Sequence, residues 1–279
     1  MEPVGRSVKP NRRGSTCGHR ASVAISGGGN TIMVGGPTDA NNHAAWVYAR
    51  SSLPFISSHG VVNGANFLPG IAPGAWITVR GLNLSDATRT WRDSDFTGNA
   101  LPTELDGVRV TVNGRAAYVY YISPTQLNVL SPDDATIGPV DVRVVNGGGT
   151  SNLVKATQSA LSPALFAWSD SAARYVAAVR ADGAYLGPDV PAKPGDMLFG
   201  TGFGPTSPAQ PIGQLVSAAP LAAEVNVQIG GVRASTTFAG LISPGLYQFN
   251  VVIPDVPDGD RPITYRLAAL SRYQLCYCP

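Results

Sequence analysis

Apolar residues along this chain come in short alternating runs closed by glycine or proline, and runs with helical spacing are nearly absent. Residues 21–51 contain three such runs, at 23–25, 31–34 and 45–48. Alternation with a period of two is typical of strands that bury one face. Residues 21–52 are therefore predicted to form a small β-meander, which is too short to bury a core by itself.

The remainder of the chain contains an internal repeat. The segment "PGAWITVRGLNL" from Pro73 matches "PGDMLFGTGFGP" from Pro194, and residues 108–134 match residues 225–256. Paired landmarks recur at nearly one offset: Gln126 with Gln248, Asn128 with Asn250, and Ile122-Ser123-Pro124 with Ile242-Ser243-Pro244. Separate landmarks at nearly one offset indicate that a single strand order is used twice.

Each repeat follows the same plan of short strands and tight turns. A Pro-Gly turn opens an apolar strand, and a later hairpin turns at Asn113-Gly114 in one repeat and at Gly230-Gly231 in the other. Such dipeptides favour type I′ turns, which need positive φ at both central residues. Strands at this spacing predict two-layer sandwiches of about 100 residues each. The fold class is therefore predicted to be all-β, with two tandem immunoglobulin-like β-sandwiches behind the short N-terminal meander.

The pattern also places the boundaries of these parts. Sandwich 1 is predicted at residues 53–161, and a linking hairpin with sandwich 2 at residues 162–270. Residues 1–20 are basic and without pattern, which is typical of a disordered tail. Residues 271–279 abandon the alternation and are predicted to be an irregular tail.

Composition excludes several classes of partner and cofactor. A net charge of +2 produces no strong electrostatic field, and the basic residues near the start have no aromatic residues among them. Both features argue against a nucleic-acid partner. The three cysteines are confined to the chain ends, and the three histidines lack metal-ligand spacing, so no metal and no cofactor are expected. No apolar run is long enough for a membrane span, and no secretory signal is recognisable in the chain.

Two resemblances to known families follow from the motifs. Residues 56–267 are similar to the C-terminal immunoglobulin-like domain of large secreted proteins of Acidobacteria, through "GVVNGANF" (60–67), "LPTELDGVRVTVNG" (101–114), "YISPTQLN" (121–128) and "PAKPGDMLFGTGFGPT" (191–206). The resemblance implies an extracellular or cell-surface location and a non-catalytic module appended to a larger protein. Residues 21–51 resemble one FG-GAP repeat, the blade unit of integrin-type propellers, without the regular Asp/Asn spacing of that family's calcium loop.

Catalytic chemistry has one candidate location. No Gly-x-Ser-x-Gly turn is present, so the usual hydrolase nucleophile is missing. The polar loop at residues 85–99 carries Asp93 and Asp95, and Glu104 follows it. Glycoside hydrolysis requires two carboxylates at a suitable separation, so these three residues are the candidates for a glycosidase site. Solvated turn residues are the alternative interpretation, and the chain is expected not to be an enzyme.

Aromatic residues near the same loop suggest a binding function instead. Trp91 lies in the loop, and Tyr118, Tyr120 and Tyr121 lie in a nearby predicted strand. Aromatic rings stack on sugar rings, so these four residues are the candidates for a carbohydrate-binding surface. Three hypotheses stay open: a structural or adhesive module that contacts a polysaccharide or cell-surface protein, a carbohydrate-binding module, and a glycosidase.

Overall fold

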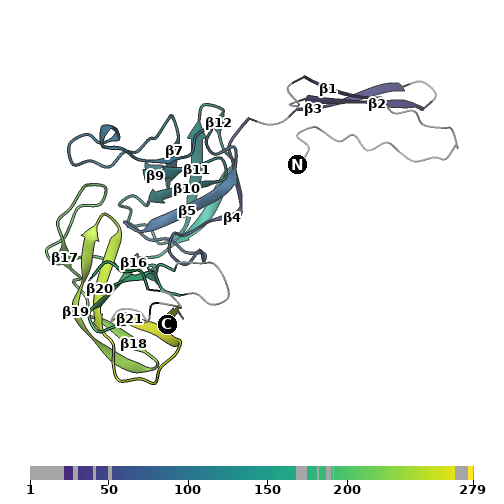
Figure 1. Ribbon diagram of the computed structural model, residues 1–279. Coiled ribbons are helices and arrows are strands. Elements are labelled where there is room, and N and C mark those ends of the chain that lie inside the picture. The colour runs from purple at the N-terminus through teal and green to yellow at the C-terminus, as the bar shows by residue number, and fades with distance from the viewer. Residues whose placement is uncertain are drawn as a thin grey trace. The chain divides into compact units, whose positions relative to one another are not determined.

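Figure 1 shows a computed structural model of the chain. It describes residues 22–27, 31–39, 42–49, 52–167, 175–180, 182–186, 190, 192–267 and 276–278. The chain divides into two compact units, Met1–Ser52 and Leu53–Pro279. The tail predicted at residues 1–20 lies outside the described residues.

The N-terminal unit contains the predicted meander. Its antiparallel strands are β1 (Ser22–Ile25), β2 (Thr31–Asp39) and β3 (Asn42–Ala49). Val23 pairs with Val34, and Ile25 pairs with Ile32. Val23 and Ile25 are nevertheless 62% and 64% exposed, so the described side chains of this sheet form no closed core. The three strands lie where the alternating pattern predicts them, within residues 21–52.

Sandwich 1 consists of two facing sheets in the C-terminal unit. One has the strand order β4-β5-β10-β9-β6, with β4 (Phe55–Asn63), β5 (Trp76–Leu82), β6 (Arg89–Thr90), β9 (Tyr118–Ile122) and β10 (Gln126–Leu130). The other has the order β12-β11-β7-β8 with β13 beside β11, and comprises β7 (Arg109–Val112), β8 (Arg115–Ala116), β11 (Gly138–Asn146), β12 (Gly149–Thr150) and β13 (Val154–Gln158). A 3₁₀ turn, η1 (Asp93–Asp95), follows β6.

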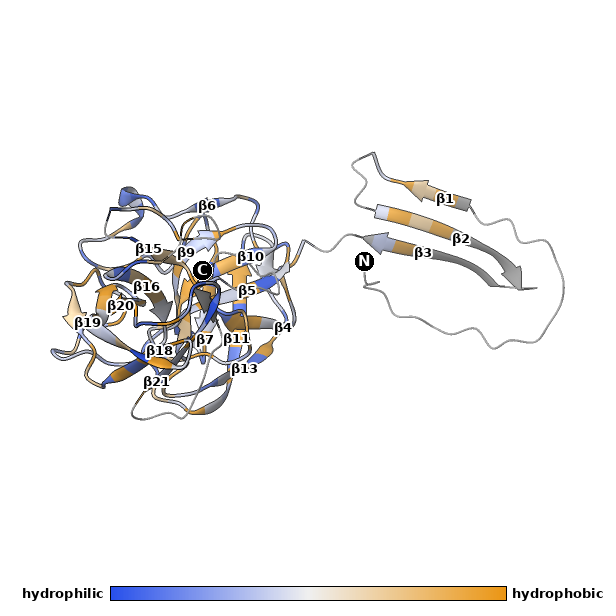
Figure 2. Cartoon of the chain, turned by 60° about the horizontal axis from the view of Figure 1, so that its bottom comes forward, coloured by the Kyte–Doolittle hydropathy of each residue, from blue (hydrophilic) through white to orange (hydrophobic). Residues whose placement is uncertain are grey.

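The core of sandwich 1 comes from aliphatic residues at every second position of the facing strands. They include Ile77, Val79, Leu127 and Val129 from one sheet, and Val110, Val112, Val142 and Val144 from the other. Burying each such side chain contributes about 1.5–3 kcal/mol. Figure 2 shows strands of the sandwiches with both orange and paler or blue positions. The intervening residues of β5 and β10, among them Trp76 and Asn128, consequently face away from this core.

Sandwich 2 is one sheet folded over at a long strand. The strand order is β14-β16-β20-β19-β18-β21-β22, with β15 beside β16 and β17 beside β19. The strands are β14 (Ala164–Leu165), β15 (Ala178–Val179), β16 (Asp196–Thr201), β17 (Ala219–Pro220), β18 (Val225–Ile229), β19 (Val232–Ser243), β20 (Leu246–Val252), β21 (Arg261–Leu267) and β22 (Cys276–Cys278). β19 pairs first with β18 and then with β20, and its register shifts twice. The two halves therefore enclose one core, which includes Phe203 and Phe249.

The predicted repeat appears as two equivalent strand sets. β5 pairs with β10 and β7 with β11 in sandwich 1, as β16 pairs with β20 and β18 with β21 in sandwich 2. Both hairpin turns have positive φ at their central residues: 51° and 76° at Asn113-Gly114, and 59° and 83° at Gly230-Gly231. These values fit the type I′ prediction. The prediction of an all-β sandwich fold is confirmed.

One boundary prediction needs correction. Residues 271–279 were expected to be irregular, but residues 276–278 form β22, which pairs with residues 261–263 of β21. The backbone groups of an exposed edge strand can pair with any extended segment, whatever its hydrophobic pattern. Residues 276–278 can therefore pair with β21 without an alternating hydrophobic pattern.

Candidate ligand-binding groove

An aromatic cluster covers part of the outer face of sandwich 1. It consists of Trp76, Trp91, Phe96 and Tyr120. The ring centroid of Trp91 lies 4.7 Å from Tyr120, 5.1 Å from Phe96 and 6.0 Å from Trp76, and all three pairs are T-shaped. Such edge-to-face pairs contribute about 0.5–1.5 kcal/mol beyond the area they bury. The four rings consequently hold one another in defined orientations.

A bulge in β9 explains how this cluster receives its tyrosine. Asn128 of β10 pairs with Tyr121, whereas the next residue, Val129, pairs with Val119, so Tyr120 is the extra residue. Val119 and Ile122 fill the core of sandwich 1. A bulge puts successive side chains on the same side of a strand. Tyr120 is thereby directed to the outer face.

An ionic network fixes the loop that carries Trp91. The Arg89 guanidinium donates to both oxygens of Asp95, at 2.7 and 3.2 Å, and to both oxygens of Asp106, at 2.7 and 2.8 Å. The Asp95 carboxylate also accepts the Arg92 backbone N–H at 2.7 Å. Hydrogen bonds from Arg89 hold the pKa of Asp95 and of Asp106 below the usual value for aspartate. The Arg89 guanidinium thus holds Asp95 and Asp106 through two bidentate contacts, one to each carboxylate.

This network predicts how the aromatic cluster responds to acid. A carboxylate whose pKa is lowered by folding contributes its full stabilisation above its unfolded pKa of about 3.9, and loses it as the pH falls through the lowered folded value. The near-UV circular dichroism of the cluster should therefore stay constant from pH 7 to about pH 4 and decline below that.

The matching variant is Arg89→Met, which should show a weakened signal already at pH 7, because Asp95 and Asp106 then face each other without a cation. Arg109→Met is the control, since it removes only an ion pair between two exposed side chains. Identical spectra for Arg89→Met and wild type across this pH range would contradict the assignment.

Sandwich 2 completes a groove over the aromatic cluster. The groove has a volume of about 370 Å³ and includes Trp76, Trp91, Tyr120 and Asn128 from sandwich 1, with Phe166, Ser243, Pro244 and Leu246 from the second repeat. Small-molecule sites typically measure about 300–1,000 Å³. The residues that line the groove carry no charged side chain. It therefore suits a small, uncharged ligand with apolar faces.

The two sandwiches are joined at the groove by direct hydrogen bonds. The Trp76 indole N–H donates to the Pro244 carbonyl at 3.0 Å, and the Trp76 backbone N–H donates to the Thr201 hydroxyl at 2.9 Å. That hydroxyl donates in turn to the Gly245 carbonyl at 2.7 Å. Gly245 has a φ of 67°, and a Cβ there would lie 2.3 Å from Leu130. Only glycine allows this close approach of the sandwiches.

Asn128, which lines the groove, belongs to a Gln-x-Asn pair that occurs in both repeats. Thr78 and Gln126 both hydrogen-bond to the side chain of Asn128, at 3.1 and 2.9 Å. Gln248 and Asn250 form the corresponding bond in sandwich 2, at 2.7 Å. Residues two apart on a strand share one face and are close enough to pair with each other.

The predicted aromatic residues separate into two groups. Trp91 and Tyr120 line the groove, whereas Tyr118 and Tyr121 are not among its lining residues. The Tyr118 ring lies against Gly213 of the second repeat, where it leaves no space for a Cβ. Tyr121 pairs through its backbone with Thr90 of β6. Of the four predicted residues, only Trp91 and Tyr120 therefore belong to the groove.

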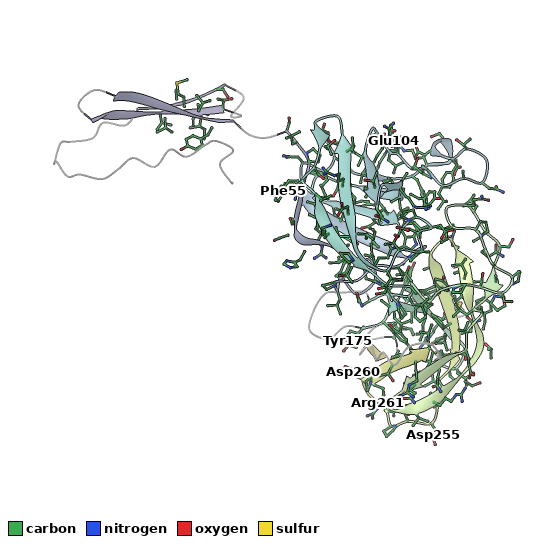
Figure 3. The ribbon with its side chains drawn as sticks, turned by 180° about the vertical axis from the view of Figure 1, so that it is seen from behind. Phe55, Glu104, Tyr175, Asp255, Asp260 and Arg261 are labelled. Atoms are coloured by element: carbon green, nitrogen blue, oxygen red, sulfur yellow. The ribbon has the colours of Figure 1, made fainter. Side chains whose placement is uncertain are left out.

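The predicted carboxylates lie outside the groove lining. Asp93 is exposed on η1, Asp95 is bound to Arg89, and Glu104 forms an ion pair with Arg109. Glu104 lies in sandwich 1, well away from Asp260 and Arg261 of sandwich 2 (Figure 3). A general acid in glycoside hydrolysis needs a raised pKa, whereas that of Asp95 is lowered. The geometry therefore favours a structural role for this acidic loop.

Two aromatic residues of the groove, Trp76 and Phe166, are not among the candidates predicted from the sequence. Trp76 was assigned only to an apolar strand, and Phe166 only to the segment that links the repeats. The signal for Trp76 was the alternation itself, since Ile77 and Val79 fill the core and leave Trp76 on the other face. Nothing in the sequence pointed to Phe166, because its position depends on the pairing of β14 with β16.

The described residues also bear on metal binding and membrane insertion. Within those residues, no three or more His, Cys, Asp or Glu side chains are grouped as metal ligands would be. The side chains of Asp39, Asn41 and Asn42, at the position of the calcium loop in FG-GAP repeats, lie outside the described side chains. In the same part of the chain, no helix has the length and apolar character of a membrane span.

Comparison with solved structures gives only distant similarity. A Bacteroides ovatus protein of a mixed-linkage glucan utilization locus, SGBP-B in complex with a mixed-linkage heptasaccharide, is 13% identical over 88% of this chain and 48% of its own, with a TM-score of 0.32. A γ-CGTase from alkalophilic Bacillus clarkii is 10% identical over 88% of this chain and 29% of its own, with a TM-score of 0.25. An auxiliary nutrient binding protein from Bacteroides ovatus is 16% identical over 80% of this chain and 57% of its own, with a TM-score of 0.23. The chain thus spans about half or less of the first two, and such low similarity transfers no ligand.

Comparison with family models gives a clearer result. The model of the IPT/TIG domain matches residues 68–158, which cover most of sandwich 1. No curated protein matches the chain. The resemblances to an FG-GAP repeat and to the acidobacterial domain stay predictions. Residues 68–158 are therefore similar to the IPT/TIG domain, and they form most of an immunoglobulin-like β-sandwich within an all-β chain.

Proposed function

We propose that this chain is a non-catalytic binding module that holds a neutral carbohydrate in the groove between its two sandwiches. The observation that carries the proposal is the lining of the groove, which combines four aromatic rings with the polar side chains of Thr78, Asn128 and Ser243 and has no charged group. Sugars present apolar C–H faces and hydroxyl edges, so they require aromatic platforms beside a few hydrogen-bonding groups.

The chemistry of the groove also supports binding without turnover. Hydrolysis of a glycosidic bond requires two carboxylates that flank it, and the lining residues include none. In the loop that carries Trp91, Arg89 forms ion pairs with Asp95 and with Asp106, which follows the loop, and neither carboxylate lines the groove. A neutral ligand also avoids the cost of placing a charge against apolar rings without a counter-ion.

The wider setting of the module is part of the same proposal. The resemblance of residues 56–267 to an appended acidobacterial domain supports an extracellular or cell-surface location and a larger parent protein. Residues 21–51 are proposed to be an FG-GAP-like element of that parent, joined in front of the binding module. In this setting the two sandwiches would attach the parent protein to a polysaccharide.

The test is affinity electrophoresis of the whole chain through gels that contain neutral or acidic polysaccharides. We expect retardation by at least one neutral polysaccharide and none by acidic ones at moderate salt. Tyr120→Ala should abolish the retardation, because it removes a groove ring that contacts both Trp76 and Trp91. Phe55→Ala is the matched control, since Phe55 is an exposed aromatic residue of β4 outside the groove. Unretarded migration of wild type in every gel would refute the proposed function.

A further inference from the structure

The side-chain amide of Asn128 lines the groove and is hydrogen-bonded to two neighbouring side chains. Its Oδ1 accepts from the Thr78 hydroxyl at 3.1 Å and from the Gln126 amide at 2.9 Å. Thr78 is only 1% exposed and is paired with Asn128 across the strands, so this partner is fixed by the sheet. Because Thr78 and Gln126 both bond to Oδ1, the Nδ2 group lies at the other end of the amide, turned away from these two partners.

The opposite end of the same amide is available to a ligand. Among the described residues, the side-chain hydrogen bonds of Asn128 all involve Oδ1 and none is donated by Nδ2, and Asn128 lines the groove. An amide nitrogen carries two donor hydrogens and no acceptor. The groove lining therefore combines this donor with the aromatic rings of Trp76, Trp91 and Tyr120.

A donor in this position discriminates between ligands. A sugar that places a hydroxyl or ring oxygen at Nδ2 satisfies the donor when the groove is closed off from water. A sugar that lacks that oxygen leaves the donor desolvated and unpaired, which weakens its binding. The aromatic rings have no comparable preference, because any apolar sugar face can stack on them.

We propose that Asn128 is the specificity-determining residue of the groove, selecting a neutral sugar whose oxygen atom accepts a hydrogen bond from Nδ2 over the corresponding deoxy sugar. This inference rests on the proposed function. It assigns affinity mainly to the aromatic rings and selectivity mainly to the amide.

The test uses NMR titration of the ¹⁵N-labelled chain with methyl glucoside, methyl galactoside and methyl mannoside and their monodeoxy analogues. For the sugar that binds, one deoxy position should weaken binding about tenfold or more in wild type, and the Asn128 side-chain amide signals should shift with the parent sugar. Asn128→Ala should bind the parent sugar about tenfold more weakly and no longer distinguish that deoxy analogue. Asn250→Ala is the matched control, because it removes the equivalent amide of sandwich 2, which is not among the groove-lining residues.

The outcomes separate this inference from the proposed function. Binding by wild type that is abolished in Tyr120→Ala but unchanged in Asn128→Ala would overturn the role of Asn128 and leave the groove as the binding site. Equal weakening by Asn250→Ala would overturn it as well. If wild type binds none of the three sugars and is retarded in no polysaccharide gel, both the role of Asn128 and the proposed function are overturned. Thermal melting of each variant verifies that the compared proteins are folded.

Discussion

Replacing Trp91 with alanine should weaken carbohydrate binding by roughly 30-fold or more, which corresponds to about 2 kcal/mol. Trp91 contacts Trp76, Phe96 and Tyr120 and is part of the groove lining. Its removal deletes one ring from the platform and also frees its aromatic neighbours to move. Aromatic residues at the centre of a binding surface typically cost at least this much when truncated. Isothermal titration with the polysaccharide that retards wild type provides the measurement.

Two comparisons make this result specific to the ring. Trp91→Phe keeps an aromatic side chain and should retain most of the affinity, whereas Phe55→Ala should bind like wild type. Trp91→Ala should unfold in a single cooperative transition at somewhat lower denaturant, because Trp91 packs against the core of sandwich 1 only in part. A folded Trp91→Ala protein with wild-type affinity would exclude the groove as the binding site.

The largest effect on stability is expected for Thr201→Val. The Thr201 hydroxyl is fully buried, accepts the Trp76 backbone N–H and donates to the Gly245 carbonyl. Valine has a similar shape but no hydroxyl, so it leaves a donor and an acceptor unpaired in a buried junction. Each unpaired group costs about 1–3 kcal/mol, which predicts a total loss of about 2–6 kcal/mol. Unfolding in urea, followed by circular dichroism, measures this loss.

A matched threonine separates the hydrogen bonds from the change of residue type. Thr237 lies on β19 with its side chain exposed, so Thr237→Val should change the stability by less than about 0.5 kcal/mol. Because Trp76 and the Pro244-Gly245 turn form one wall of the groove, Thr201→Val should also weaken ligand binding. Equal stability of the two valine variants would show that the junction does not depend on the Thr201 hydroxyl.

Sequence reasoning recovered those features that depend on neighbours along the chain. The type I′ turns at Asn113-Gly114 and Gly230-Gly231 follow from local φ preferences, and their φ values agree. The candidate site was only partly recovered. Trp91 and Tyr120 were identified from their residue type, but Tyr118, Tyr121 and the three acidic candidates do not line the groove. Residue type shows what a side chain can bind, whereas its neighbours in space decide whether a ligand can reach it.

The repeat illustrates this difference most clearly. Ser123-Pro124 and Ser243-Pro244 are equivalent in sequence, yet they have different neighbours. The Pro124 carbonyl accepts the Leu84 N–H within sandwich 1, whereas the Pro244 carbonyl accepts the Trp76 indole N–H of the other sandwich. The same motif thus closes a loop in one copy and forms a wall of the groove in the other.

The amino-acid sequence by itself determined the all-β class, the succession of strands along each repeat and the hairpin turns, because alternation and turn preferences act between residues close together in the chain. The tertiary structure alone decided that Trp76, Phe166 and the Ser243-Pro244 turn meet at one groove. That meeting depends on how the two sandwiches pack, through the hydroxyl of Thr201 and the missing Cβ of Gly245. Contacts between residues more than a hundred positions apart leave no periodic pattern in a single sequence.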